Sequence, residues 1–535
     1  GDIRHICIIG GWMIVAALIG LYAGIMGGVC GANASAGFAR NLRKAMYENI
    51  QQFSFSNIDR FSTAGLITRL TTDVTNVQNA YQMLLRMFVR APISMVCAMF
   101  MSFYINAKLA SIYLVAVIIL GACLFFIISR VSGYFQEVFK KYDDLNASVQ
   151  ENIAGIRVVK AYVREDYEDK KFSKASYNVY KMFVKAEKIL SYNAPLMQFA
   201  VYSCILGISW LGAKMIVTDQ LTTGELMSLL TYCMNILMSL MMVSMVFVMV
   251  SMSVASAERI TEVLEEKPEL TNPERPVMEV EDGSIVFDHV NFSYKKGSGG
   301  YVLKDINLDI HAGETIGIIG GTGSAKSSLV NLISRLYDVT NGSIKVGGMD
   351  VRSYDMETLR NQVAVVLQKN VLFSGTILEN LRWGNKEASK EECIRACKLA
   401  CADEFIEKMP EGYETYIEQG GSNVSGGQKQ RLCIARALLK KPKVLILDDS
   451  TSAVDTATDA RIREAFAKEI PGTTKLIIAQ RISSVQGADR IIVMNDGQVD
   501  GFGTHEELLA NNQIYREVYE SQTQGGGDFD EKGGA

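Results

Sequence analysis

Five long apolar runs in the first half of the chain constrain its fold more than any other feature. Each is long enough to cross roughly 30 Å of hydrocarbon as a helix. The last is the clearest, because the stretch from Leu226 to Val250 contains no charged residue. The sequence therefore predicts a polytopic α-helical membrane domain over residues 1–260. The five runs lie at about 6–31, 84–105, 108–130, 190–217 and 225–253.

The charges between the runs predict how the spans are oriented. The segments after the first run and between the third and fourth are long and rich in Lys and Arg. The turns at Asn106–Lys108 and Thr218–Glu225 are short and nearly free of positive charge. Because cytoplasmic connections carry an excess of Lys and Arg, the long segments are expected inside and the short turns outside. Five crossings that end inside must begin outside, so we expect a further span to precede Gly1.

The two basic segments are themselves expected to be helical. They carry apolar residues at helical spacing and few prolines or glycines, which favours helices that continue from the spans into the cytoplasm. We expect these helices to reverse, and to touch another domain, near Ser54–Gly65 and Ala161–Asp169. The many methionines of the last run are typical of ordinary helix packing and lipid contact, and a flexible substrate-contacting surface is the alternative.

After about residue 253 the composition becomes that of a soluble protein. Three prolines mark a linker over 261–283, an α/β pattern covers 284–520, and a glycine-rich flexible tail is expected over 521–535. The net charge of -4 gives no reason to expect nucleic acid as a partner. Cys393, Cys397 and Cys401 recur at helical spacing; without a histidine or a C-x-x-C pair, helix packing is favoured over a metal site.

A glycine-rich loop lies between an expected strand and an expected helix. Its sequence matches the phosphate-loop pattern G-x-x-x-x-G-K-[ST], except that Ala325 stands where the last glycine is expected. Such a loop turns backbone N–H groups toward phosphate oxygens. Lys326 is expected to reach the β- and γ-phosphates of a nucleotide and Ser327 to bind Mg²⁺. Alanine is tolerable at position 325 if the residue keeps a negative φ, although it removes the freedom that glycine would give. The predicted nucleotide-binding residues of the loop are Gly320, Gly321, Thr322, Gly323, Ser324, Ala325, Lys326, Ser327 and Ser328.

Two further motifs fit the same chemistry. An apolar strand ends in Asp448 and Asp449, and the first carboxylate is placed to hold a hydrated Mg²⁺. A run of Ser, two glycines and Gln opens a helix, whose N-terminus is another favourable phosphate site. The predicted binding residues of this run are Ser425, Gly426, Gly427 and Gln428.

Together these motifs resemble the nucleotide-binding domain of ATP-binding cassette (ABC) transporters. Val424–Gln428 is similar to that family's L-S-G-G-Q signature, and the resemblance covers about 284–520. The membrane half resembles an exporter half-transporter, in which six spans precede the nucleotide domain. Since Ser62–Leu70 is similar to the segment after the family's second span, the first span is the one expected to be missing. The implied fold is an exporter-type helical membrane domain with long intracellular helices, followed by an α/β phosphate-loop ATPase domain with a helical subdomain.

The resemblance assigns roles to further residues. Tyr294 matches the aromatic residue that stacks on adenine, and Gln368 matches the glutamine that joins Mg²⁺ and the attacking water to the membrane contacts. Ser452–Asp455 matches the loop that crosses to the opposing subunit, and 54–65 and 161–169 match the two coupling helices. Two such domains dimerise head to tail in this family, so the signature of one completes the ATP site of the other.

Two departures from the family pattern fall on the chemistry. Asp449 stands where the family has its general base, a glutamate, and Gln480 stands where it has a switch histidine. Aspartate is shorter by one methylene, about 1.5 Å, and a misplacement on that scale costs about 10²-fold in rate. A neutral amide donates a hydrogen bond but does not titrate as an imidazole does. The implied catalytic residues are Asp449, Gln480 and Gln368, and the implied metal ligands are Ser327, Gln368 and Asp448.

These features predict one subunit of a heterodimeric exporter in a bacterial cytoplasmic membrane, with its nucleotide-binding domain in the cytosol. The chain is expected to bind ATP and Mg²⁺, to hydrolyse ATP weakly, and to serve a second half-transporter subunit that carries the glutamate and the histidine. The spans contain few charges, which favours hydrophobic or amphipathic substrates such as drugs, lipids or peptides, with membrane lipids as neighbours. A nucleotide-gated channel or regulatory subunit, and a homodimeric lipid flippase, are the alternatives.

Overall fold

The computed structural model describes residues 3–295, 300–449 and 454–524 and divides the chain into two compact units. The helical unit comprises Gly1–Gln52 and Phe61–Lys267, and the α/β unit comprises Phe53–Arg60 and Pro268–Ala535. The division after Lys267 falls within the predicted linker. Each unit is described by itself below.

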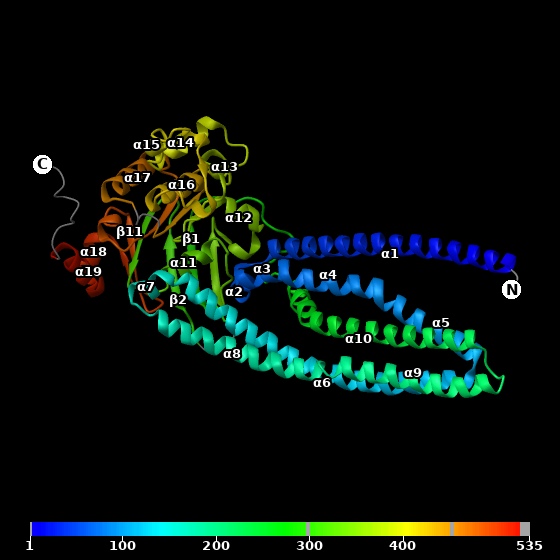
Figure 1. Cartoon of the computed structure of the whole chain (residues 1–535). Helices are drawn as coiled ribbons and strands as arrows, with labels where there is room; N and C mark the ends of the chain where they lie inside the picture. Colours follow the sequence, from blue (N-terminus) through cyan, green and yellow to red (C-terminus); the bar gives the residue numbers. More distant parts are fainter. Residues whose placement is uncertain (1–2, 296–299, 450–453, 525–535) are drawn as a thin grey trace. The chain divides into compact units, whose positions relative to one another are not determined.

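Long helices make up the helical unit (Figure 1). Within the described residues, five helical segments are long and apolar enough to cross a membrane, and they contain the five predicted apolar runs. They are 43 to 53 residues long. At about 1.5 Å per residue they are more than twice as long as the hydrocarbon core is thick, so the predicted helical extensions are confirmed. The segments are Ile3–Gln52 (α1), Thr63–Ile105, Ala107–Ala154 (α6), Glu165–Val217 and Thr223–Glu265 (α10).

The second and fourth segments are interrupted helices. The second contains two π-helical stretches between shorter α-helices, and the fourth has a turn between α8 (Glu165–Leu190) and α9 (Asn193–Val217). Helix α7 (Ile156–Ala161) and the turn after it form the predicted reversal between α6 and α8. The second segment is made of α3 (Thr63–Thr68), η1 (Arg69–Asp73), α4 (Val74–Met83), η2 (Leu84–Phe88) and α5 (Arg90–Ile105).

A buried ion pair joins the second segment to α10. Asp73, in the first π-helical stretch, is fully buried. The guanidinium of Arg259 donates to both carboxylate oxygens, at 2.8 and 2.6 Å, and the Ser256 hydroxyl donates to one of them at 2.9 Å. A fully buried carboxylate requires this many donors, because an unpaired charge in the interior costs several kcal/mol.

The α/β unit contains a six-stranded sheet in the order β12-β11-β3-β10-β9-β6. The strands β11, β3, β10, β9 and β6 pair in parallel, and β12 is an antiparallel edge strand. An antiparallel sheet, β2-β1-β4-β5, and a short β7-β8 pair complete it. The strands are β1 (Ile285–Phe292), β2 (Leu303–Ile310), β3 (Thr315–Gly320), β4 (Asn341–Val346), β5 (Met349–Asp350), β6 (Val363–Val366), β7 (Gly375–Thr376), β8 (Tyr416–Ile417), β9 (Val444–Asp448), β10 (Thr474–Ile478), β11 (Arg490–Asn495) and β12 (Gln498–Gly503).

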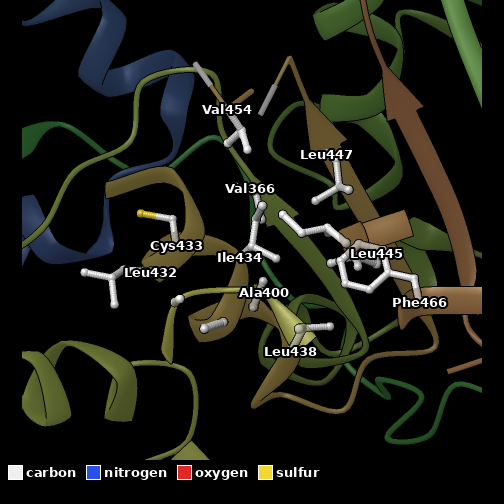
Figure 2. Close-up of a cluster of buried hydrophobic side chains, with 14 of the residues drawn as sticks. Val366, Ala400, Leu432, Cys433, Ile434, Leu438, Leu445, Leu447, Val454 and Phe466 are labelled. Atoms are coloured by element: carbon white, nitrogen blue, oxygen red, sulfur yellow. The ribbon is translucent and has the colours of Figure 1, made fainter. Parts of the chain in front are cut away.

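Both faces of the central sheet are covered. Alternate residues of β9 point to opposite faces, so Leu445 and Leu447 join one buried cluster while Val444 and Ile446 join the other. Figure 2 shows the first cluster, in which side chains of α16 meet β9 and Phe466. The helices of this unit are α2 (Phe55–Arg60), α11 (Lys326–Ile333), α12 (Met356–Gln362), α13 (Ile377–Arg382), α14 (Lys390–Leu399), α15 (Asp403–Ile406), α16 (Gly426–Leu438), α17 (Thr456–Glu469), α18 (His505–Asn511) and α19 (Gln513–Gln524).

Helix α2 belongs to the α/β unit although both of its neighbours in the chain belong to the helical unit. The hydroxyl of Tyr337 donates to the Asp59 carboxylate at 2.6 Å, and the rings of Phe55 and Tyr337 meet edge to face with centroids 6.1 Å apart. The Asn57 side chain accepts the backbone N–H of Glu269 at 3.2 Å. These contacts involve the first of the two segments that were predicted to touch another domain.

Two sequence expectations need adjustment. Cys393 and Cys397 are buried on α14, as helix packing predicts, but Cys401 lies beyond the end of that helix at φ 51°. No group of His, Cys, Asp or Glu suited to a metal ion occurs among the described residues. Helix α19 extends to Gln524, four residues past the predicted domain end at 520. The rest of the predicted tail, 525–535, lies outside the described residues.

Candidate functional site

Three loops meet at one edge of the central sheet. Strand β10 lies between β3 and β9, and all three are parallel, so their carboxyl ends are adjacent. The phosphate loop follows Gly320 at the end of β3, Asp449 follows β9, and Gln480 comes two residues after β10. The carboxyl edge of a parallel sheet is where ligands bind in open α/β folds. The topology therefore brings together motifs that are far apart in the sequence.

Glycine is required at the start of the phosphate loop. Gly320 has φ 156°, and a Cβ atom there would lie 2.3 Å from the carbonyl oxygen of Met494. Gly323, in the middle of the loop, has φ 86° in the left-handed region, and nothing lies within 4 Å of the position of a Cβ. Close packing excludes a side chain at Gly320, whereas backbone conformation disfavours one at Gly323.

Ala325 does not keep a negative φ, the condition under which alanine is tolerable in the phosphate-loop pattern. Its φ is 71° and its ψ is 24°, a left-handed conformation at the N-cap of α11. The turn into the helix needs this conformation, which explains why the pattern has glycine at that position. Ala325 packs against the buried cluster that includes Leu329.

The N-terminus of α11 forms the centre of the loop. Ala325 offers no side-chain oxygen to cap the helix, so no side chain satisfies the first N–H groups of α11 from the N-cap. Lys326 lies over the loop and donates to the carbonyl oxygens of Gly320 and Gly321, both at 2.8 Å. Burial lowers the pKa of Lys326, against the opposing effect of the Asp449 and Asp448 carboxylates. Helix N–H groups and a lysine at one place favour a bound phosphate.

Ser327 and Asp448 are brought together as predicted. The Ser327 hydroxyl donates to the Asp448 carboxylate at 3.0 Å, across 121 residues of sequence. Burial raises the pKa of Asp448; the Ser327 hydrogen bond and the Lys326 charge oppose this rise, and the Asp449 charge adds to it. Hard oxygen donors beside a second carboxylate form a donor set that fits Mg²⁺. Ser327 and Asp448 would hold the ion, and bound there it would neutralise charge on the phosphates.

The three implied catalytic residues also meet. The Gln480 side-chain amide donates to Asp449 Oδ2 at 2.7 Å, and the Gln368 amide approaches the same oxygen at 3.4 Å. Asp449 is mostly buried, with 9% of its surface exposed, and has φ 46°. Two amides from two loops thus hold one short carboxylate beside Asp448.

Tyr294, predicted to stack on adenine, contacts the phosphate loop through its hydroxyl group. That hydroxyl and the Ser328 hydroxyl are 2.9 Å apart, and the Tyr294 ring meets the Tyr337 ring edge to face at 5.1 Å. Tyr294 as a whole is 46% exposed. Tyr337 also binds Asp59 of α2, a contact that no local sequence pattern indicates.

The signature run begins α16. Ser425 is the N-cap; its hydroxyl accepts the Gln428 backbone N–H at 3.3 Å, and the Gln428 side chain accepts the Ser425 N–H at 2.9 Å. Gly426 and Gly427, which lie between Ser425 and Gln428, are the first two residues of the helix. Ser425 and Gly426 are exposed, so this helix N-terminus is available to another molecule.

Two parts of the site differ from what the sequence predicts. In the predicted crossing loop, Ser452 and Ala453 lie outside the described residues, while Asp455 caps α17 by accepting the Thr458 N–H at 2.9 Å. Gln522 of α19, whose side chain binds the backbone around Gln480, was not predicted. It was missed because residue 522 falls in the segment assigned to the tail.

The fold and the site define a phosphate-loop nucleotide hydrolase fused to a multi-span membrane domain. Residues 2–257 match the family model described as ABC transporter transmembrane region, and residues 303–452 match the one described as ABC transporter. The chain belongs to the ABC transporter family. It is an ATP-binding integral membrane protein of exporter architecture, with fused membrane and ATPase domains.

Individual relatives support this assignment. The chain is 38% identical over 521 residues to the uncharacterized ABC transporter ATP-binding protein YfiB of Bacillus subtilis, covering 97% of this chain and 90% of the relative. It is 34% identical over 488 residues to an ATP-dependent lipid A-core flippase of Desulfotalea psychrophila, covering 90% and 84%. The structure of a bacterial Atm1-family ABC exporter with ATP bound matches with TM-score 0.84 at 24% identity, covering 98% of this chain and 92% of that one, and confirms the fold.

Proposed function

We propose that this chain is the weakly hydrolysing subunit of a heterodimeric ABC exporter. Its own site binds ATP with Mg²⁺ through the phosphate loop, Ser327 and Asp448. It donates Ser425–Gln428 to the ATP site of a partner subunit that carries the glutamate and the histidine. The observation that carries the proposal is the Asp449–Gln480 pair, in which an amide 2.7 Å from a short carboxylate occupies the position of the catalytic machinery.

The chemistry of that pair argues for slow turnover. A general base must lie within hydrogen-bond reach of the water it activates. The aspartate oxygen is about 1.5 Å further back than a glutamate oxygen would be, and misplacement on that scale costs about 10²-fold. The binding residues Lys326, Ser327 and Asp448 remain in place, which supports ATP binding without rapid hydrolysis.

Mutating the two functions separately in this chain tests the proposal. We expect Ser425→Ala to reduce the ATPase activity of the purified transporter about tenfold or more, because it removes a donor from the partner's site. We expect Asp449→Asn to reduce it less than about twofold, since this site contributes little. Asp449→Glu combined with Gln480→His should raise hydrolysis at this site.

Two results would contradict the proposal. One is an equal loss of activity in Ser425→Ala and Asp449→Asn. The other is a homodimer of this chain with rapid, transport-coupled ATPase activity. Lys326→Ala serves as the control that removes nucleotide binding by this chain.

A homodimeric lipid flippase is the second candidate. Relatives from Desulfotalea psychrophila and Syntrophus aciditrophicus, 34% and 31% identical, are named ATP-dependent lipid A-core flippases. Whether a second, different subunit co-purifies with the chain separates the two candidates. A single subunit with lipid-stimulated ATPase activity favours the flippase.

The last span supports an apolar or amphipathic substrate. Its methionines Met234, Met238, Met241 and Met245 recur at helical spacing and are about half exposed, while Leu237 and Leu240 are buried. Flexible thioethers accommodate substrates of different shape. Stimulation of ATPase activity by candidate drugs and lipids, measured on the transporter in lipid nanodiscs, identifies the substrate class.

A further inference from the structure

The end of α19 contacts the segment that carries Gln480. We call Gln480–Ile482 the switch segment. It follows β10 and leads into a short 3₁₀ turn, Ile482–Ser484, against which α19 packs. Figure 1 shows α19 as the last labelled element of the chain. The contact therefore links the C-terminal helix to the loop that contributes an amide to the ATP site.

One side chain of α19 holds the backbone of the switch segment at two points. The side-chain amide of Gln522 donates to the carbonyl oxygen of Gln480 at 2.9 Å, and its carbonyl oxygen accepts the backbone N–H of Ile482 at 2.8 Å. A primary amide has one acceptor and two donors, so a single glutamine satisfies a C=O and an N–H two residues apart. The two bonds fix both the position and the direction of the backbone at Gln480.

The helix that supplies Gln522 is firmly attached to the α/β unit. Tyr515 is fully buried, and its hydroxyl is 2.7 Å from Nδ1 of His505. Ile514, Val518 and Tyr519 pack against the same buried cluster that contains Ile482. The Gln522 clamp, meaning its two bonds to the switch segment, is thus anchored in the core.

Other contacts hold the far side of the same loop. Arg481 donates to the Thr456 hydroxyl at 3.2 Å, and the Ser484 hydroxyl donates to the buried carboxylate of Asp459 at 2.9 Å. Both acceptors lie on α17, so α17 and α19 hold the loop from two helices. The bond from Gln522 acts on the peptide carbonyl of Gln480 itself.

The geometry points to Gln522 as a positioning residue for the ATP site. By holding the Gln480 carbonyl and the Ile482 N–H, it sets the place from which the Gln480 side chain donates to Asp449 at 2.7 Å. A shift of the backbone by a fraction of an ångström changes where that donor lies, and therefore how Asp449 is oriented. The inference rests on the proposed roles of Gln480 and Asp449 in hydrolysis.

The test compares matched variants of the transporter in lipid nanodiscs. Gln522→Ala removes both bonds. Gln522→Glu keeps the acceptor for Ile482 but loses the donor to Gln480. Gln513→Ala is the control, because Gln513 lies on the same helix and its side-chain amide donates to Glu517, one turn away on that helix, at 2.8 Å.

The first measurement is hydrogen exchange at the Ile482 amide. We expect Gln522→Ala to accelerate exchange about two- to tenfold, the range for loss of one hydrogen bond, and Gln522→Glu and Gln513→Ala to leave it protected. Unchanged exchange in Gln522→Ala would overturn the clamp. This readout does not depend on how fast the site hydrolyses ATP.

The second measurement is hydrolysis at this chain's own site. The transporter is loaded with 8-azido-ATP that is labelled on either the α- or the γ-phosphate. Samples are photolysed at successive times, and the ratio of γ- to α-label attached to this chain is measured in each. We expect Gln522→Ala and Gln522→Glu to slow the loss of γ-label about three- to tenfold, with α-label binding and the Gln513→Ala control unchanged.

If Gln522→Ala accelerates exchange at the Ile482 amide but leaves the rate of γ-label loss unchanged, the positioning role is overturned. If the variant no longer binds the α-labelled nucleotide, Gln522 has a structural role instead. If this site proves to hydrolyse ATP rapidly, the weak-site proposal fails, but both comparisons among the variants still hold.

Discussion

At the scale of single residues, the phosphate loop combines a binding motif with one strained position. Ala325 has φ 71°, where the conformation costs an L-residue with a Cβ about 1 kcal/mol. Glycine relieves this strain, although its greater freedom in the unfolded chain costs about 0.5–1 kcal/mol. The two effects nearly cancel, which explains how the chain tolerates alanine here.

We therefore expect Ala325→Gly to retain ATP binding and thermal stability, with a free energy of unfolding within about 1 kcal/mol of the parent. Ala325→Val should weaken ATP binding by about tenfold or more, because a β-branched residue at positive φ is a severe misfit. Equilibrium titration with ATP and thermal unfolding check both. Normal ATP binding by the valine variant would contradict the strain argument.

The same scale shows what the sequence could predict of the site. Lys326, Ser327, Asp448 and Ser425 were identified because each lies in a short contiguous motif whose spacing carries the chemistry. The sign of φ at Ala325 could not be read from that pattern. Nor could the partners of Tyr337 and Gln522, since both depend on approach between segments far apart in the chain.

At the scale of elements, α2 is held to the α/β unit by a small contact set. The Tyr337 hydroxyl donates to Asp59 at 2.6 Å, and burial together with the Asp59 charge raises the pKa of Tyr337. The phenol therefore stays protonated and remains a donor over the whole physiological pH range. In this hydrogen bond a neutral donor faces an ionised acceptor, and such a bond is stronger than one between two neutral groups.

We expect Tyr337→Phe to accelerate hydrogen exchange of the backbone amides in α2 about two- to tenfold, as loss of one hydrogen bond implies. Tyr301→Phe is the matched control, because Tyr301 bonds to Asn341 at 2.9 Å elsewhere in the same unit. If the control accelerated exchange in α2 equally, the change would not be due to the Asp59 bond.

Element boundaries followed the sequence where periodicity or capping was strong. Asn106 caps α6, Thr222 forms a capping box at α10, and both coincide with the predicted external turns. The π-helical stretches around Asp73 and Leu84 were not predicted, because a π-helical turn has no composition of its own. The C-terminal helix was cut short, since its last turn is polar and resembles a tail.

At the scale of the whole molecule, the charges between the apolar runs predict the orientation of the spans. Gln220 lies in the short turn between α9 and α10, and Arg164 lies in the turn between α7 and α8. Both are exposed. The excess of Lys and Arg around Arg164 predicts that its turn is cytoplasmic and that the turn of Gln220 is external.

We expect Gln220→Cys to react with a membrane-impermeant maleimide on intact cells, and Arg164→Cys to react only after permeabilisation. The unsubstituted chain gives the background from its ten native cysteines, and permeabilised cells give the maximum for each variant. The reverse pattern of labelling would show that the ATPase domain does not lie in the cytosol.

The place of α2 in the α/β unit also imposes an order on biosynthesis. Asp59 is made 278 residues before Tyr337. At about 5–20 residues per second this is a delay of roughly 14–56 s. During that time the membrane helices on both sides of α2 can insert while α2 itself has no folded surface to dock on. Substitutions in α2 should therefore leave membrane insertion intact and interfere only with a late step of assembly, which exposes the defective chain to proteolysis after it is already in the bilayer.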